Sequence, residues 1–156
     1  MGIEIERKFL VNKELWEALD KPEGKHYRQG YLLNGEDRVV RVRIAGDHGY
    51  ITVKGAGEGI SRLEFEYEIP KHDAQEMLDR FKPEGTEKIR YRIPEGSGLV
   101  WEVDEFLGAN QGLIVAEIEL NFEDQLFSQP DWLGEEVSED NRYSNSSLAL
   151  NPMTQY

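Results

Sequence analysis

Polar and apolar residues alternate along most of the chain, and the pattern begins within the first ten residues. In "GIEIERKFLV", Glu4, Glu6 and Lys8 occupy every second position, with apolar residues between the first two. Successive side chains of a β-strand point to opposite faces, so this stretch predicts a strand with a charged face. Residues 61–69 ("SRLEFEYEI") alternate even more strictly and predict a second strand of the same kind.

The same period of two predicts about eight strands in total. No repeat, linker or low-complexity tract divides the sequence, so we expect one domain over residues 1–156. The predicted strands cover residues 2–11, 26–33, 38–44, 50–54, 61–69, 87–93, 99–106 and 114–120.

Helical periodicity is confined to short stretches between and after these strands. Residues 12–20 predict a short helix with Asn12 as its cap. In residues 71–83 the apolar positions recur at helical spacing, and Asp73 with Glu76 resembles a capping box. The tail that follows the last strand is predicted to be loop and short helix.

Like charges lie two positions apart on several of the predicted strands. Arg41 with Arg43, and Glu117 with Glu119, are the clearest pairs. A polar face can simply meet water, as in many antiparallel sheets. However, like charges about 7 Å apart repel each other, and a ligand of opposite charge between them relieves the repulsion. We therefore favour a mainly β fold with flanking helices (α+β), in which eight antiparallel strands close into a barrel with a charged interior and apolar faces turned outward under the helices.

Acidic and basic side chains inside one tunnel suit a particular chemistry. Carboxylate oxygens bind hard cations such as Mg²⁺ or Mn²⁺, whereas Arg and Lys bind phosphate oxygens. Phosphoryl transfer uses both, because metal ions and fixed cations together neutralise the charge of a phosphate chain.

Composition narrows the remaining classes of protein. The chain has 31 acidic and 18 basic residues, and the net charge of −13 disfavours nucleic acids and anionic membranes as partners. It has no cysteine and only three scattered histidines, which argues against a zinc cage. We find no apolar run of about 18 residues and no signal sequence, so a cytoplasmic protein is expected.

Charged motifs follow one another along nearly the whole chain. They are Glu4-x-Glu6-x-Lys8, Arg41-x-Arg43, Lys54, "SRLEFE", "EKIRYR", "VDEF", "EIEL" and "WLGEEVSEDNRYSN". This ordered set resembles the CYTH superfamily of triphosphate tunnel metalloenzymes. The compact length is similar to that of short stand-alone bacterial members that resemble inorganic tripolyphosphatases; relatives include thiamine triphosphatases and class IV adenylate cyclases.

The resemblance implies a tunnel that binds a triphosphate together with Mg²⁺ or Mn²⁺. It implies metal-facing acids at Glu4, Glu6, Glu64, Glu66, Asp104, Glu117 and Glu119. It implies phosphate-binding cations at Lys8, Arg41, Arg43, Lys54, Lys88 and Arg90, with Arg62 and Arg142 as further candidates. It also implies catalytic roles for Lys8 or Lys54 and for Tyr31. Neighbouring cations would lower the pKa of the lysine, which would then assist in activating water, and Tyr31 would orient water or a lysine.

Two other features invite a functional interpretation that we do not adopt. The segment "KGAGEG" resembles a phosphate loop but lacks the Gly-Lys-Ser/Thr ending, and we interpret it as a hairpin connection. Trp16, Trp101 and Trp132 are expected in the core, because no basic residues interleave with them as in a stacking platform.

Three functions from different classes follow. The preferred one is divalent-metal-dependent hydrolysis of a triphosphate, above all inorganic tripolyphosphate. A class IV-type adenylate cyclase is the first alternative, and it would need a site for adenine that the sequence does not display. The second is a non-catalytic module that binds polyphosphate or nucleotides. The expected partner is a small-molecule triphosphate, and a homodimer is left open.

Overall fold

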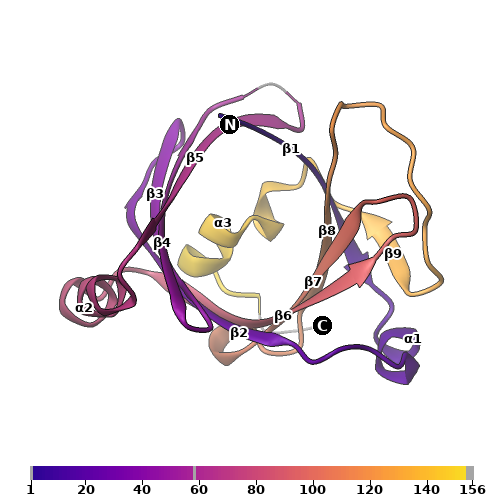
Figure 1. Ribbon diagram of the computed structural model, residues 1–156, viewed down its shortest axis with the longest axis horizontal. Coiled ribbons are helices and arrows are strands. Elements are labelled where there is room, and N and C mark those ends of the chain that lie inside the picture. The colour runs from indigo at the N-terminus through magenta and orange to yellow at the C-terminus, as the bar shows by residue number, and fades with distance from the viewer. Residues whose placement is uncertain (1, 58, 154–156) are drawn as a thin grey trace.

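The computed structural model describes residues 2–57 and 59–153, and a closed antiparallel β-barrel dominates it (Figure 1). The barrel strands follow the order β5-β4-β3-β2-β6-β7-β8-β1, and β1 pairs with β5 to close the ring. The bounds are β1 Ile3–Val11, β2 Lys25–Asn34, β3 Arg38–Ala45, β4 His48–Gly55, β5 Ser61–Ile69, β6 Gly85–Pro94, β7 Val100–Phe106 and β8 Ile114–Glu119. The eight strands predicted from alternation are confirmed.

The first strand has three partners, and this arrangement closes the barrel. One edge of β1 pairs with β8, with Lys8 opposite Glu117. The other edge pairs near its start with β5, with Ile3 opposite Leu63, and near its end with β9, Leu133–Glu136. The sequence analysis placed a loop where β9 lies, because four residues of "LGEE" carry no alternation.

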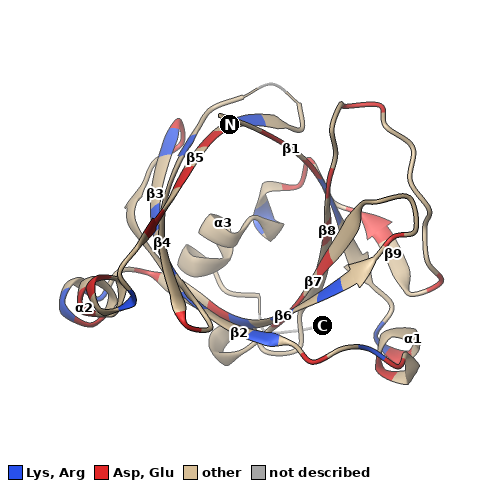
Figure 2. Cartoon of the chain, in the orientation of Figure 1, with Lys and Arg blue, Asp and Glu red and all other residues tan. Residues whose placement is uncertain are grey.

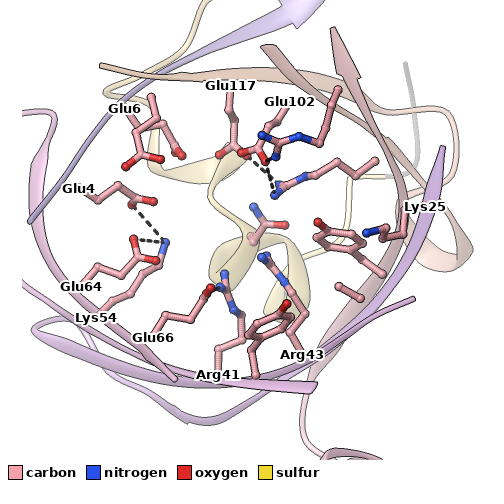
Figure 3. Close-up of a pocket in the computed structure, with 17 residues that line it drawn as sticks. Glu4, Glu6, Lys25, Arg41, Arg43, Lys54, Glu64, Glu66, Glu102 and Glu117 are labelled. Carbon is pink, nitrogen blue, oxygen red and sulfur yellow. Dashed lines mark hydrogen bonds and ion pairs between the residues drawn. The ribbon is translucent and has the colours of Figure 1, made fainter. Parts of the chain in front are cut away.

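Figure 2 shows acidic and basic residues recurring along the barrel strands, and the labelled charged side chains point into the barrel in Figure 3. The apolar residues between them point outward and form a core outside the ring. In this core Phe9, Trp101 and Ile118 pack with Trp16 and Trp132. The prediction that the three tryptophans lie in the core is therefore confirmed.

Helices cover only part of the outer surface. Helix α1, Lys13–Ala18, contributes Trp16 to the outer core, and helix α2, Lys71–Phe81, packs Ala74 and Leu78 against Val42 of β3. On β5 the outward-facing Phe65 and Tyr67 are 45% and 61% exposed. The prediction that helices cover the apolar faces is thus wrong for this strand.

One of the two helix caps predicted from the sequence is confirmed. The side chain of Asn12 accepts a hydrogen bond from the backbone N–H of Leu15, as the cap prediction requires. The predicted capping box of Asp73 and Glu76 is wrong, because α2 begins at Lys71, two residues before Asp73, and its N-cap residue is Pro70. Asp73 therefore lies in the first turn, where its negative charge still favours the helix dipole.

The end of the described chain lies inside the barrel rather than outside it. After the short 3₁₀ helices η1 (Gly108–Asn110) and η2 (Asn141–Tyr143), helix α3 (Asn145–Leu150) sits within the ring of strands in Figure 1. Leu148 of α3 packs with Phe106 and Val115, which share the inward faces of β7 and β8 with Asp104 and Glu117. One end of the interior is therefore apolar and filled by α3.

Candidate active site

Two adjoining cavities occupy the interior of the barrel. The first has a volume of about 280 Å³ and the second, toward α3 and the β2–β3 and β4–β5 connections, about 640 Å³. "KGAGEG" forms the β4–β5 connection as predicted, although Glu58 lies outside the described residues. The residues that line both cavities are Glu4, Glu6, Arg41, Lys54, Glu117 and Asn145.

Most of the residues predicted from the sequence meet at these cavities. In the close-up of Figure 3, the labelled acids and cations point toward one another from opposite strands. The predicted residues that line at least one cavity are Glu4, Glu6, Glu64, Glu66, Glu117, Glu119, Lys8, Tyr31, Arg41, Arg43, Lys54, Arg62 and Arg90.

Three predicted residues do not line either cavity. Asp104 and Lys88 lie on the inward faces of their strands but are buried against Arg90 and Asn145 and do not reach the open space. Arg142 has a side chain that is 70% exposed, and its Nη2 lies 2.6 Å from Oδ2 of Asp140 in the same turn. The structure thus separates these three from the acids and cations that face the open space.

Two pairs of carboxylates dominate the acidic side. Glu4 and Glu64 share a hydrogen bond, and burial together with this bond raises the pKa of Glu64 to about 7. Glu6 and Glu117 share another, and burial followed by the charge of Glu117 holds the pKa of Glu6 well above its usual range. Glu64 and Glu6 therefore keep a proton to a higher pH than an isolated carboxylate does.

The partner in each pair stays ionised because cations face it. Burial raises the pKa of Glu4, but Lys54, whose Nζ lies 3.3 Å from Oε1 of Glu4, and the hydrogen bond with Glu64 together lower the pKa overall. Burial likewise opposes ionisation of Glu117, but Lys8 and the bond from Glu6 bring its pKa well below the usual value. Each pair thus contains one acid with a lowered pKa, Glu4 or Glu117, and one acid that ionises only at higher pH.

Buried guanidinium groups form the cationic side. Arg41 is 5% exposed; its Nη2 donates to Thr52 and lies 3.4 Å from Glu66, whereas its buried Nε has no hydrogen-bond partner among the described residues. Nε of Arg43 donates to Oε1 of Gln29 at 2.7 Å. Burial, then Arg41 and Arg90, lower the pKa of Arg43 to about 10, so it stays protonated at neutral pH in a local excess of positive charge.

Arg90 is fixed from behind by the buried Asp104. Its Nε and Nη2 donate to the two oxygens of Asp104 at 2.7 and 2.9 Å, and Nη2 also contacts Glu117 at 3.2 Å. Nζ of Lys88 lies 2.7 Å from Oδ2 of the same carboxylate. Asp104 therefore neutralises and orients two buried cations of β6.

The comparisons with known proteins agree with this geometry. The sequence profile of the CYTH domain matches residues 2–149. The chain belongs to the CYTH family.

Relatives within the CYTH family include curated enzymes. The chain is 53% identical over 154 residues to a protein of Acetivibrio thermocellus named inorganic triphosphatase, covering 97% of this chain and 96% of that protein. A protein of Nitrosomonas europaea with the same name is 38% identical, covering 94% and 97%. A crystal structure of an inorganic triphosphatase has a TM-score of 0.67 at 34% identity over 99% of both chains. A putative adenylate cyclase of Bacillus halodurans, at 19% identity, covers 80% of this chain and 84% of its own with a TM-score of 0.64, and shares the fold.

The acids of this CYTH protein suit a hard divalent cation, although they lie as two pairs. No group of three or more His, Cys, Asp and Glu side chains with metal-site spacing occurs among residues 2–57 and 59–153. Glu4–Glu64 and Glu6–Glu117 nevertheless bring carboxylate oxygens from different strands within hydrogen-bond distance, held together by a shared proton. A divalent cation can take the place of that proton, and oxygen ligands of this kind are the ones that Mg²⁺, Mn²⁺ and Ca²⁺ prefer.

The lysines behave differently from the sequence prediction. Burial lowers the pKa of Lys8, but Glu117 and Glu6 more than compensate, so the pKa is raised. The prediction of a lowered pKa for Lys8 is therefore wrong, because acids rather than cations surround it. Lys54 also faces acids, Glu4 and Glu64. The lowered value belongs instead to Lys88, where burial, then Arg90 and Arg43, bring the pKa to about 7 despite Asp104.

Sequence reasoning missed several residues of this CYTH tunnel. Tyr27, Gln29 and Tyr31 alternate on the inward face of β2, and this parity could have located them. Tyr31 was predicted, whereas Tyr27 and Gln29 are uncharged and carry none of the like-charge signal that indicated the other residues. Glu102 shares the inward face of β7 with Asp104 and does line the first cavity. Asn145 lies in the tail, where no strand pattern indicates a direction.

No helix among the described residues is both long and apolar enough to cross a membrane.

Proposed function

We propose that this CYTH protein hydrolyses inorganic tripolyphosphate in its tunnel, with Mg²⁺ or Mn²⁺ as the cofactor. The observation that carries the proposal is the opposition of two carboxylate pairs to a cluster of buried arginines across one cavity. The names of the curated relatives, inorganic triphosphatase, support it. The cytoplasmic location, the lack of nucleic-acid and membrane partners, and the homodimer stay predictions of the sequence.

The cationic side supplies the contacts for a phosphate chain. Arg41, Arg43 and Arg90 face the cavity from neighbouring regions of the barrel, and planar guanidinium groups bind phosphate oxygens through two hydrogen bonds at once. The unpaired Nε of Arg41 is a donor ready for such an oxygen. Lys54 contacts Glu4 and Lys8 contacts Glu117, and both lysines line the second cavity, so we assign them to phosphate oxygens that face the acidic side.

The acidic side holds the metal in this proposal, through Glu4, Glu64, Glu6 and Glu117, with Glu66 and Glu119 beside them. A divalent cation bound there neutralises the charge of the phosphoryl group and helps to orient an attacking water. The charged Lys8 cannot accept a proton from that water, because its pKa is raised. It acts instead as a fixed positive charge, which stabilises the growing charge of the leaving phosphate.

Products of tripolyphosphate and ATP distinguish the proposal from its alternatives. Each substrate is incubated with the protein and Mg²⁺ or Mn²⁺, and the products are separated by chromatography. We expect faster turnover of tripolyphosphate than of ATP, with orthophosphate and pyrophosphate as products. Cyclisation of ATP requires the 3′-hydroxyl to be held about 3 to 3.5 Å from the α-phosphorus by contacts to ribose and base. Cyclic AMP from ATP with tripolyphosphate untouched would overturn the proposal, and binding without turnover would indicate the non-catalytic module.

A further inference from the structure

The first residue of α3, Asn145, lies where the two cavities meet. It lines both of them, although it comes from the C-terminal tail and not from the barrel. Its Oδ1 accepts hydrogen bonds from Nζ of Lys88 at 2.8 Å and from Nε2 of Gln29 at 3.2 Å. One oxygen atom of the tail therefore ties together two side chains from different barrel strands.

Gln29 carries this link to the first arginine. Its side chain is buried, and Oε1 accepts the bond from Nε of Arg43 while Nε2 donates to Asn145 and lies 3.3 Å from the hydroxyl of Tyr31. An amide can accept with its oxygen only if its NH₂ points the other way, so the bond to Asn145 helps to fix which atom faces Arg43.

Lys88 carries the link to the second arginine. Its ammonium bridges Oδ1 of Asn145 and Oδ2 of Asp104, and Asp104 holds Arg90 through both oxygens. The guanidinium carbons of Arg43 and Arg90 each lie 4.9 Å from the ring centre of Tyr27. The contacts form a closed ring that passes from Arg43 through Gln29, Asn145, Lys88, Asp104, Arg90 and Tyr27 back to Arg43.

The anchoring of α3 makes Asn145 a firm point in this ring. Oγ of Ser144 caps the helix by accepting from the N–H of Ser147, and Leu148 is fully buried against the apolar end of the interior. The cations of the ring repel one another, as the pKa values of Arg43 and Lys88 show. Loss of the Asn145 oxygen would remove a partner from the buried ammonium and from the Gln29 amide at once, so both would rearrange.

We propose that Asn145 is a positioning residue that fixes Arg43 and Arg90 for the phosphate chain, so that α3 is a working part of the site. The inference rests on the proposed function. Phosphate contacts must be placed to within about 0.5 Å to be productive, and supporting hydrogen bonds supply that placement. Outer-shell partners that orient metal ligands typically change affinity or activity by about 10- to 100-fold when they are removed, and we expect a similar effect for a residue that orients phosphate contacts.

Asn145→Ala and a matched control, Asn110→Ala, test the proposal. Asn110 anchors the other end of the same segment, through Nδ2 to the carbonyl of Leu148 and Oδ1 to the N–H of Met153, and it lines neither cavity. We expect Asn145→Ala to lower kcat/KM for tripolyphosphate by about 10- to 100-fold, with metal affinity within about twofold of wild type. Asn110→Ala should lower Tm while kcat/KM at 25 °C stays within about threefold. Equal loss of kcat/KM in both variants, or wild-type kcat/KM in Asn145→Ala, would refute the positioning role.

A double-mutant cycle with Gln29→Met tests the path itself. If Asn145 acts through Gln29, the double variant should be little worse than the poorer single variant, whereas additive losses would contradict the link. Calorimetric titration of metal-free protein with tripolyphosphate gives a readout without turnover, and we expect about 10-fold weaker binding in Asn145→Ala. If wild type binds tripolyphosphate but releases no phosphate, the proposed function fails. The titration still decides the inference, because unchanged binding in Asn145→Ala would refute it.

Discussion

Replacing Glu64 with glutamine should stabilise the metal-free protein at alkaline pH and leave it unchanged in acid. Glu64 and Glu4 share a proton, and the pKa of Glu64 lies at about 7 instead of 4.5, first through burial and then through that bond. An acid whose pKa is raised by folding adds stability below its unfolded pKa, and that stability is lost as the pH rises through the folded pKa. The glutamine side chain would keep the size and a donor toward Glu4 but would never ionise.

The size of the effect follows from the pKa. A rise from 4.5 to about 7 corresponds to about 3 kcal/mol, because each pKa unit equals about 1.4 kcal/mol. The Glu64 side chain is only 19% exposed, so solvent screens this cost weakly. Between pH 4.5 and pH 8, Glu64→Gln should therefore gain about 3 kcal/mol relative to wild type, which is about 6 to 12 °C in Tm for a chain of this size.

Thermal unfolding followed by circular dichroism, in EDTA at pH 4.5 and pH 8, measures this difference. Glu68→Gln is the matched control, since Glu68 lies on the same strand, is 60% exposed and pairs with His48 at the surface. Mg²⁺ or Mn²⁺ at about 1,000 times its Kd and pH 8 should then reverse the order, because a cation held by both carboxylates stabilises wild type by about 4.1 kcal/mol at that concentration. A gain in Tm that is the same at both pH values, or is matched by Glu68→Gln, would refute the account of the acid pair.

Three further outcomes are expected. Glu6→Gln should abolish phosphate release at saturating metal while circular dichroism shows an intact fold, because it removes a proposed metal ligand but also a like-charge contact with Glu117; full activity would exclude the assignment. Arg41→Ala should weaken tripolyphosphate binding by about 1.5 to 3 kcal/mol and leave metal affinity of the substrate-free protein unchanged, as separate calorimetric titrations would show; equal loss of metal affinity would contradict it. Asp104→Asn should cost about 3 to 5 kcal/mol in urea unfolding, since it leaves Lys88 and Arg90 buried without their carboxylate; a cost below about 1 kcal/mol would show that other groups compensate.

Local alternation was enough to predict the barrel and much of its interior. Inward and outward positions follow from parity once a strand is assigned, so Glu4, Arg41 and Glu117 could be placed on the tunnel side from the sequence. Parity says nothing about what lies behind a side chain. Asp104 has the correct parity for a metal ligand, yet its carboxylate forms ion pairs with Lys88 and Arg90 of the neighbouring strand and does not reach the cavities.

Features that depend on distant pairing were not accessible in the same way. Strand β9 exists because the free edge of β1 accepts it, and its own four residues carry no signal. Asn145 enters the site because Leu148 finds an apolar pocket inside the barrel, which no local pattern around residue 145 reveals. The sign of the pKa change at Lys8 likewise depends on Glu117, its partner across more than a hundred residues of sequence.

The closure of the ring by β1 has a consequence for how the protein folds. The first strand finds its partners only when residues 61–63 and 115–119 are in place, so the last pairings join segments far apart in sequence. Such contacts slow folding, because the entropy of closing long loops is lost before the contacts form. The two acid pairs, Glu4–Glu64 and Glu6–Glu117, bridge the two junctions of β1 with the rest of the barrel. Above about pH 7, where Glu64 ionises beside Glu4, repulsion between these carboxylates therefore opposes closure at the β1–β5 junction, and a divalent cation that binds them would favour the closed ring.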